Sequence, residues 1–302
     1  MTIFRIISFD GGGIRGSLST RILTRICAKY PQLLSHTDLF AGTSTGALIA
    51  LSLAYGKDAA YIDNLYNYET IKSVFTPSHL NIFKPKFKNK NLKNMVSCVF
   101  PENLTLGNLE KYVFVPSFNL KGFSSDNWQT VFFNNLSKGS TYSSNVIDVA
   151  MSSSAAPTYF PTYNNFIDGG VIANNPSAAA MISVIKTIKP RHPLTDFRIL
   201  SIGTGVTINK ITADTSSWGV FQWMISPMSN VKTPLLTILL NDTPLEDLYC
   251  KELLGNNYFR INPTLKHKIP LDDYEKIPLL KSAADELDLT ETFKFIENFY
   301  LK

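Results

Sequence analysis

Two glycine-rich segments, each directly after a short apolar run, constrain the fold of this chain more than any other feature. The first run, Ile3–Phe9, leads into Asp10-Gly-Gly-Gly-Ile-Arg-Gly16, and the second, Asp38–Ala41, leads into Gly42-Thr-Ser-Thr-Gly46. A helical pattern follows each segment, amphipathic after Gly16 and apolar over Ala47–Ala54. A buried strand, a tight loop and a helix form the unit from which α/β proteins are built.

The same alternation continues along the chain and predicts its fold class. Further strands are expected at Tyr112–Phe118, Gln129–Phe133, Phe197–Ile202 and Tyr258–Ile261, and helices at Asn145–Ser153, Pro176–Lys186, Thr233–Tyr249 and Leu289–Tyr300. No internal repeat, low-complexity tract or flexible linker divides the 302 residues. We therefore predict a single domain over residues 1–302, a three-layer α/β/α sandwich around a mostly parallel central sheet.

Composition narrows the function classes. Cys27, Cys98 and Cys250 are far apart and have no Cys or His at ligand spacing, so neither a metal site nor a disulfide framework is expected. The apolar stretch Ala47–Tyr55 is far shorter than the roughly 20 residues that span a bilayer. The first residues are typical of a strand and not of a signal peptide. We expect a cytoplasmic or peripheral membrane location, and export without a cleavable signal peptide stays open.

A run of lysines makes one segment strongly basic. Lys84, Lys86, Lys88, Lys90 and Lys93 occur without an acidic residue among them, in a chain whose formal net charge is +5. Aromatic and proline residues alternate with these lysines, which suits an anionic surface such as a membrane leaflet; the alternative is a solvated loop. No helix-turn-helix, zinc or base-stacking signature accompanies the run, so a nucleic acid partner is not expected.

The second glycine segment fits the nucleophile elbow G-x-S-x-G, with Ser44 at its centre. In such an elbow the serine occupies a strained turn between a strand and a helix. Gly42 and Gly46 are needed there because a Cβ would meet neighbouring backbone. We therefore interpret Ser44 as a nucleophile and not as an idle serine in a glycine-rich turn.

The first glycine segment predicts an anion site. Gly11, Gly12 and Gly13 expose consecutive backbone N–H groups in front of a helix N-terminus. Gly11, Gly13 and Gly16 also match the dinucleotide fingerprint, but the acid that would bind a ribose is absent, and a dinucleotide site has no use for a serine elbow. We favour an oxyanion hole made by the amides of Gly12 and Gly13, with Arg15 supporting the loop or the charge.

A nucleophilic serine needs a base, and the sequence offers two kinds. His192 and His267 follow the serine as the histidine of a triad would, but both lie in basic strings without an orienting acid. Asp168, between an apolar run and Gly169-Gly170, is typical of a carboxylate at a strand end; its alternative role is an Asx turn. Aspartate is a weak base, so its site must desolvate it or assist the proton transfer by a hydrogen bond.

A later aromatic stretch has two interpretations. Trp218, Trp223, Met224 and Met228 could line an apolar pocket, but such a stripe is more often part of the core. We expect these residues in the core.

Together these segments resemble the three signature blocks of the patatin-like phospholipases. The blocks are Asp10-Gly-Gly-Gly-Ile-Arg-Gly16, Gly42-Thr-Ser-Thr-Gly46 and Asp168-Gly169-Gly170, in this order. Further stretches similar to the family are Ser153–Pro161, Ile199–Gly205, Trp218–Met224 and Asn256–Ile261. The last two are most similar to plant patatins and their bacterial relatives, and the resemblance covers nearly the whole chain.

The resemblance implies a lipid acyl hydrolase with a Ser-Asp dyad. On this basis Ser44 is the nucleophile, Asp168 activates it, Gly12 and Gly13 form the oxyanion hole, and Arg15 takes the basic position beside it. The implied reaction cleaves phospholipids or galactolipids through an acyl-enzyme at a membrane or micellar surface, without calcium or another cofactor. Two rivals stay open: a soluble carboxylesterase or thioesterase with the same dyad, and a catalytically silent storage or scaffold protein. No protein partner is indicated.

Overall fold

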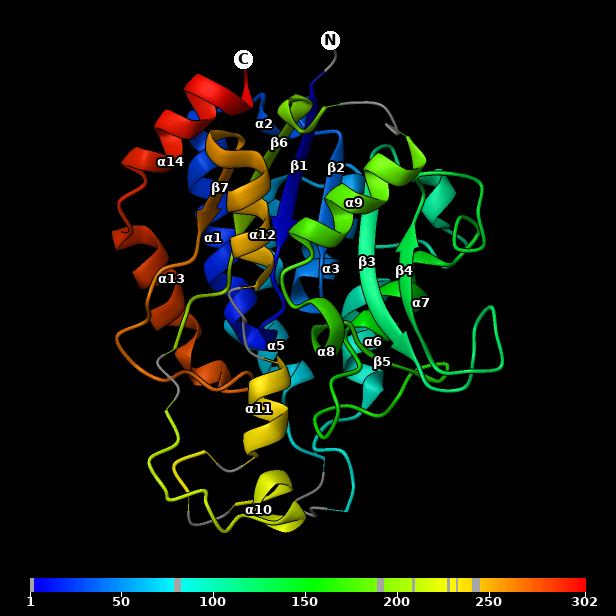
Figure 1. Ribbon diagram of the computed structural model, residues 1–302, viewed down its shortest axis with the longest axis vertical. Helices are drawn as coiled ribbons and strands as arrows, with labels where there is room; N and C mark the ends of the chain where they lie inside the picture. Colours follow the sequence, from blue (N-terminus) through cyan, green and yellow to red (C-terminus); the bar gives the residue numbers. More distant parts are fainter. Residues whose placement is uncertain are drawn as a thin grey trace.

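One central sheet organises the chain, of which the computed structural model describes residues 3–78, 83–188, 193–207, 210–226, 229–231, 233–240 and 245–302. In these ranges the sheet has seven strands: β1 (Phe4–Phe9), β2 (Leu39–Gly42), β3 (Tyr112–Asn119), β4 (Gln129–Asn134), β5 (Phe166–Asp168), β6 (Phe197–Ile202) and β7 (Tyr258–Ile261). The strands are labelled in Figure 1.

The helices of the same ranges differ widely in length. They are α1 (Gly16–Lys29), α2 (Leu33–His36), α3 (Thr45–Ala54), α4 (Ala59–Leu65), α5 (Tyr68–Val74), α6 (Asn89–Ser97), α7 (Val146–Ser153), α8 (Gly170–Ala173), α9 (Ser177–Thr187), α10 (Val220–Met224), α11 (Pro234–Leu240), α12 (Leu245–Leu254), α13 (Ile277–Glu286) and α14 (Thr290–Phe295). A π-helical segment, Ile296–Tyr300, continues α14.

The sheet is mostly parallel, as the sequence predicts. Its order is β4-β3-β2-β1-β6-β7, and β5 pairs with β3. Strands β3, β2, β1, β6 and β7 run parallel, whereas β4 and β5 are antiparallel to β3. The chain leaves the central strand β1 first toward β2 and β3, and later returns to β6 on its other side. The carboxyl end of β1 is therefore the point where the strand order reverses, which is where open α/β sheets bind ligands.

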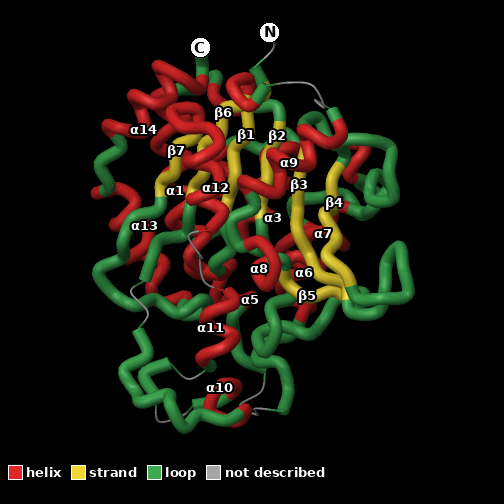
Figure 2. Tube along the Cα trace, viewed as in Figure 1, coloured by secondary structure: helices red, strands yellow, loops and turns green. Residues whose placement is uncertain are grey.

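Helices cover both faces of the sheet, so the predicted three-layer sandwich is confirmed. Successive strand residues point to opposite faces. Ile7 packs in a core cluster with Leu18 of α1, whereas Ile6 packs in a second cluster with Met181 of α9. Figure 2 shows the strands between α9 and α12 on one side and α1 and α3 on the other.

The expected strands are found within one residue of their predicted ends. Strands β1, β2, β3 and β6 are largely buried apolar runs, whereas β4 and β7 are only partly buried. The expected helix over Thr233–Tyr249 corresponds to two described helices, α11 and α12, and α12 extends to Leu254. Residues 241–244, between them, lie outside the described ranges.

The aromatic stretch near residue 220 does not lie in the core, so that expectation was wrong. Met224 is 54% exposed, and Trp218 and Trp223 are only partly buried. The two tryptophan rings pack edge to face, with centroids 5.3 Å apart. Met228 lies outside the described residues. The stretch instead belongs to a lobe around α10, at the end of the molecule opposite the termini (Figure 1).

Candidate active site

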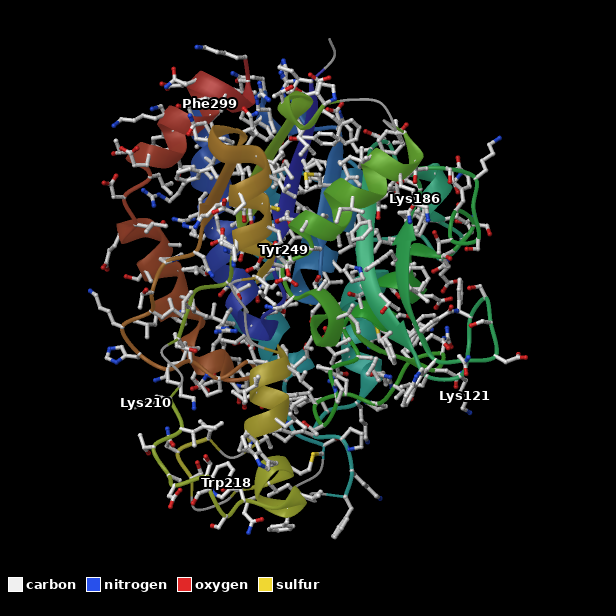
Figure 3. The ribbon with its side chains drawn as sticks, viewed as in Figure 1. Lys121, Lys186, Lys210, Trp218, Tyr249 and Phe299 are labelled. Atoms are coloured by element: carbon white, nitrogen blue, oxygen red, sulfur yellow. The ribbon has the colours of Figure 1, made fainter. Side chains whose placement is uncertain are left out.

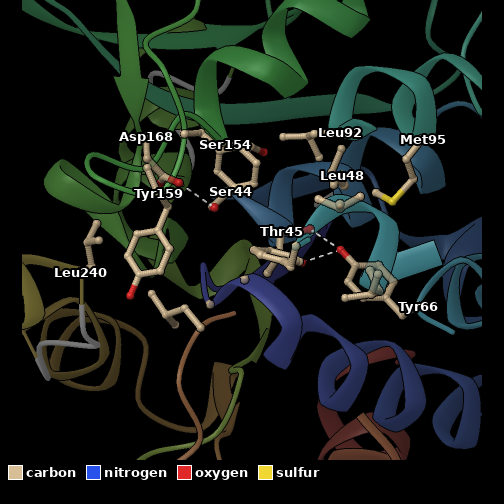
Figure 4. A pocket seen from close by; sticks show the side chains of 18 of the residues that line it. Ser44, Thr45, Leu48, Tyr66, Leu92, Met95, Ser154, Tyr159, Asp168 and Leu240 are labelled. Atoms are coloured by element: carbon tan, nitrogen blue, oxygen red, sulfur yellow. Dashed lines mark hydrogen bonds between the residues drawn. The ribbon is translucent and has the colours of Figure 1, made fainter. Parts of the chain in front are cut away.

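A pocket opens at the carboxyl ends of β1 and β2, where the two glycine segments meet. It holds about 680 Å³ of empty space, its open mouth included. Gly12, Gly13, Ser44, Asp168 and Asn174 supply its polar groups near the sheet. Most of the remaining wall is apolar and is formed by Leu48, Ile71, Val74, Phe75, Leu92, Met95, Ala156, Phe160, Leu240 and Leu271. Figure 4 shows Ser44 and Asp168 facing each other at one side of this pocket.

Ser44 sits in the sharp turn between β2 and α3. Its backbone has φ 55° and ψ −118°, a left-handed conformation that costs about 1–3 kcal/mol for a residue other than glycine. Space at the turn explains both flanking glycines. A Cβ on Gly42 would lie 2.0 Å from the carbonyl oxygen of Gly46, and one on Gly46 would lie 2.3 Å from that of Phe9. The turn therefore has the form of a nucleophile elbow.

Hydrogen bonds from two other segments hold this strained turn. The amide of Ser44 donates to Oγ of Ser153 at 3.0 Å, and that hydroxyl donates to the carbonyl oxygen of Pro116 on β3 at 2.7 Å. The hydroxyl of Thr43 donates to the carbonyl oxygen of Ala173 at 2.6 Å. Ser153 was not among the predicted site residues, although it opens one of the stretches that resemble the family. A single serine at a helix end is too common in sequences to indicate that its hydroxyl supports the turn at Ser44.

Ser44 and Asp168, 124 residues apart in the chain, form a direct hydrogen bond. Oγ of Ser44 donates to Oδ2 of Asp168 at 2.7 Å, and the amide of Gly170 donates to Oδ1 at 2.7 Å. Asp168 reaches this place because β5 pairs with β3 in a register that sets Asp168 opposite Ser117. The pairing is close, since a Cβ on Gly169 would lie 2.1 Å from the carbonyl oxygen of Pro116.

Burial gives Asp168 unusual basicity. Its side chain is almost fully enclosed, with the residue only 2% exposed. This desolvation raises the pKa of Asp168 to about 6, although the hydrogen bonds from Ser44 and Gly170 act in the opposite direction by favouring the carboxylate. A carboxylate with this pKa is a better proton acceptor than an exposed aspartate.

The first glycine segment faces the same pocket. The amides on either side of the glycine pair are engaged: Gly11 donates to the carbonyl oxygen of Asn174 at 3.0 Å, and Ile14 donates to that of Leu271 at 2.9 Å. Within the described residues, the amides of Gly12 and Gly13 have no such backbone acceptor. Both glycines line the pocket beside Ser44. Two backbone N–H groups of the loop therefore lie at the pocket without a backbone acceptor among the described residues.

Steric contacts explain why this loop consists of glycines. Gly13 has φ 55°, and a Cβ on it would lie 2.2 Å from the carbonyl oxygen of Leu271. A Cβ on Gly12 would lie 2.3 Å from the hydroxyl oxygen of Thr204, and one on Gly11 would lie 2.3 Å from Oδ1 of Asn174. At Gly16 a Cβ would lie 2.2 Å from Oγ1 of Thr45, so α1 passes close to the elbow.

Charged residues at the ends of the loop make structural contacts. Arg15 is buried, with 4% of its surface exposed. Its backbone amide donates to the carbonyl oxygen of Gly12 at 3.1 Å, and its side-chain Nη1 donates to the carbonyl oxygen of Gly205 at 3.3 Å. Arg15 is not among the residues that line the Ser44 pocket. Asp10 forms a buried ion pair with Arg260 of β7, at 2.5 Å between Oδ2 and Nη2. Sequence reasoning assigned no role to Arg260, which lies in one of the family-like stretches.

The histidine alternative gains no geometric support from the described residues. His36 and His267 are exposed, and neither lines the pocket. His79 and His192 lie outside the described ranges. In the part of the chain that the structure describes, no three His, Cys, Asp or Glu side chains are grouped to hold a metal ion. Nor is any helix of that part long and apolar enough to cross a bilayer.

Comparison with known proteins links this geometry to a family. A family model described as Patatin-like phospholipase matches residues 7–181. The chain is 31% identical to protein teg of Priestia megaterium, over 98% of this chain and 99% of that protein. It is 31% identical to a cGAMP-activated phospholipase of Escherichia coli, over 66% of this chain and 62% of that protein. The chain is also similar to the solved structure of VipD from Legionella pneumophila, with 13% sequence identity and a TM-score of 0.44. The superposition covers 94% of this chain and 67% of the VipD chain.

Proposed function

The chain belongs to the patatin-like phospholipase family, and on this premise we propose that it is a lipid acyl hydrolase with a Ser44–Asp168 dyad. The observation that carries the proposal is the 2.7 Å hydrogen bond from Ser44 Oγ to Asp168 Oδ2 at the wall of an apolar pocket. No histidine of the described residues lines that pocket, which leaves Asp168 as the base in contact with the serine.

In the acylation step, Oγ of Ser44 attacks the carbonyl carbon of a fatty-acyl ester while its proton passes to Oδ2 of Asp168. The carbonyl oxygen becomes negatively charged, and the amides of Gly12 and Gly13 donate to it. Collapse of the tetrahedral intermediate breaks the ester bond. The departing alcohol takes the proton from Asp168, and the acyl group stays on Ser44.

In the deacylation step, water replaces the alcohol. Asp168 accepts a proton from the water as its oxygen attacks the acyl-enzyme, and the same two amides stabilise the second oxyanion. Ser44 Oγ leaves and takes the proton back from Asp168, which releases a fatty acid. The amide of Gly170, at 2.7 Å from Oδ1, keeps the other carboxylate oxygen in place through both steps.

The pocket walls support a fatty-acyl substrate. Apolar side chains of α3, α5 and α6, including Leu48, Val74 and Met95, line the pocket. Figure 4 shows Leu48 and Met95 on the side away from Asp168. Burial of an acyl chain against such walls stabilises the bound ester by about 0.8 kcal/mol per methylene group. We propose phospholipids or galactolipids as substrates, with peripheral contact to a membrane or micellar surface.

Replacement of the nucleophile tests the proposal. We expect Ser44→Ala to lower ester hydrolysis by several orders of magnitude, because it removes the oxygen that would carry the acyl group. A fluorophosphonate probe should label Ser44, as mass spectrometry of the digested protein would show. Thr45→Ser, which keeps a hydroxyl beside the elbow, is the matched control and should remain active. Labelling of another serine, or an active Ser44→Ala protein, would contradict the dyad.

A further inference from the structure

The lobe around α10 exposes apolar side chains to an unusual degree. Val220 is 82% exposed, Phe221 66% and Met224 54%, and none of the residues of α10 is buried. We call residues 218–226 and 233–240 the apolar lobe. It projects at one end of the long axis of the molecule, with Trp218 labelled in Figure 3. Clustered apolar groups on a projecting surface mark a site of interaction.

Helix α11, which belongs to the apolar lobe, extends to the catalytic pocket. Its last residue, Leu240, lines the pocket that contains Ser44, whereas Leu235, Ile238 and Leu239 are 41–49% exposed. Helices α10 and α11 pack against each other. The exposed apolar surface is therefore continuous with one wall of the pocket, and Figure 4 shows Leu240 on the Asp168 side of the pocket.

The segment 83–88 adds a second exposed apolar group and positive charge at the same end of the molecule (Figure 1). Phe83 is 88% exposed and is followed by the exposed Lys84. Phe87 anchors this segment: it is 1% exposed and its ring lies 5.2 Å from that of Phe75 and 5.4 Å from that of Phe160. Both of these rings line the catalytic pocket, so the segment is fixed beside it.

We propose that the apolar lobe and the segment 83–88 form a docking surface for an anionic lipid bilayer, an inference that rests on the proposed lipid hydrolase function. Residues 215–240 contain no acidic residue, so insertion of the lobe would carry no carboxylate into the membrane. Lysines beside inserted aromatic and aliphatic groups match anionic headgroups. Docking in this way places the pocket next to the bilayer from which its substrate must be drawn.

Charge favours a bilayer over a second copy of the chain. A two-fold dimer formed through this surface would bring the lysine-bearing segments of both copies into one interface. Like charges facing each other in that way oppose association. An anionic leaflet has the opposite charge and an apolar interior, so it complements both features of the surface.

The test is vesicle binding by a lobe variant, compared with a matched control. The variant Val220→Thr with Phe221→Gln removes apolar contact without altering the pocket. The control, Ile182→Thr with Trp128→Gln, changes the same residue classes at exposed positions on α9 and before β4, with 58% and 71% exposure. Binding to vesicles that contain one third phosphatidylglycerol is measured by flotation, and hydrolysis of a soluble short-chain ester is measured in parallel.

We expect the lobe variant to bind vesicles about tenfold more weakly than the control, while both hydrolyse the soluble ester as the wild type does. Equal vesicle binding by the lobe variant and the control would overturn the docking surface. A concentration-dependent dimer that the lobe variant abolishes would also overturn it, in favour of a second copy. Failure of the proposed function is distinguishable, since the wild type would then bind vesicles but hydrolyse no ester in a Ser44-dependent way.

Discussion

At the scale of single residues, the burial of Asp168 determines how the dyad responds to pH. Its pKa is raised to about 6 by desolvation, and only the ionised carboxylate can accept the proton of Ser44. We therefore expect kcat/KM for a soluble ester to rise with pH through a midpoint near 6 and to level off above it. A pH–rate profile of the wild type checks this, and an acid limb with a midpoint near 4 would contradict it.

Replacement of the same carboxyl group should separate catalysis from stability. Asp168→Asn removes the base, and we expect a loss of about 10⁴ in kcat. The pKa of Asp168 in the folded protein lies above its usual value, so ionisation of this carboxyl group destabilises the fold. The stability that the protonated form contributes is lost as pH rises through about 6. The neutral amide should then make the free energy of unfolding less dependent on pH between about 4 and 6, the range between the ordinary and the raised pKa.

Urea denaturation at several pH values measures this effect. The matched control is Asp126→Asn, an exposed residue on the β3–β4 connection, which should change neither activity nor the pH dependence. An Asp168→Asn protein that keeps its activity would exclude the carboxylate as the base. An unchanged pH dependence of unfolding would mean that burial does not disfavour the charged form.

The glycine loop makes a separate prediction for one residue. A Cβ on Gly12 would lie 2.3 Å from Oγ1 of Thr204, so Gly12→Ala should shift the loop and its amide donors. Loss of one oxyanion donor typically raises the activation free energy by about 3 kcal/mol, which lowers kcat by a factor of about 10²–10³. We expect a decrease of this size in kcat for Gly12→Ala. Gly139→Ala, where a Cβ meets nothing closer than 3.6 Å, is the control.

The readout for the loop should include labelling by a fluorophosphonate as well as turnover. Attack of Ser44 on phosphorus also places negative charge on an oxygen near the loop, so labelling should slow together with kcat. If Gly12→Ala turns over normally while circular dichroism shows a native fold, the amides of this loop do not stabilise the oxyanion.

At the scale of elements, the ion pair of Asp10 and Arg260 ties the end of β1 to β7 across β6. Both side chains are buried, at 1% and 6% exposed, and Nη1 of Arg260 also donates to Oγ of Ser201 on β6 at 2.7 Å. We expect Arg260→Met to lower the free energy of unfolding by about 3–5 kcal/mol, because it removes the guanidinium that pairs with a buried carboxylate.

A second substitution distinguishes pairing from packing. Adding Asp10→Asn to Arg260→Met removes the buried negative charge, so part of the lost stability should return. Lys294→Met, which breaks an ion pair with Glu291 between side chains 61% and 71% exposed, should lower the free energy of unfolding far less. If Arg260→Met destabilises no more than Lys294→Met, as measured by urea denaturation, the buried pair does not hold the two strands together.

The sequence predicts some elements well and others poorly, for physical reasons. Strands β1 and β2 are buried on both faces and appear as plain apolar runs, so their ends are found within one residue. Strand β5 has only three residues, too few to show a period, although Asp168 was expected at a strand end. Trp218, Trp223 and Met224 were expected in the core because apolar composition alone does not distinguish a buried side chain from an exposed one.

At the scale of the whole molecule, the candidate site joins segments that are far apart in the chain. The glycine segments could be placed together from the sequence, because they follow strands that were expected to lie in one parallel sheet. The contact of Ser44 with Asp168 depends on the antiparallel return of β5 along β3, which no local pattern specifies. Ser153 and Arg260 support the site through such long-range packing, and only the resemblance to the family drew attention to their segments.

The distribution of charge over the whole molecule makes the last prediction. Lys84, Lys88 and Lys90 are exposed, whereas Lys86 pairs with Asp272, and Nζ of Lys93 lies 5.8 Å from the ring centroid of Tyr163. If the docking surface faces an anionic leaflet, replacing its Lys84 and Lys88 and the neighbouring Lys90 with Gln should weaken vesicle binding at low salt by roughly 100-fold. Each lysine near the membrane surface contributes about tenfold or less.

The control must remove the same charge elsewhere. Gln at Lys121, Lys138 and Lys186 also lowers the formal net charge from +5 to +2, because three positive charges are lost in both variants. We expect this control to bind vesicles much more tightly than the first variant, and the difference should vanish near 1 M salt, where the screening length is about 3 Å. Hydrolysis of a soluble ester should be the same in both. Equal loss of vesicle binding in the two variants would mean that net charge, and not the orientation of the segment toward the membrane, governs the attraction.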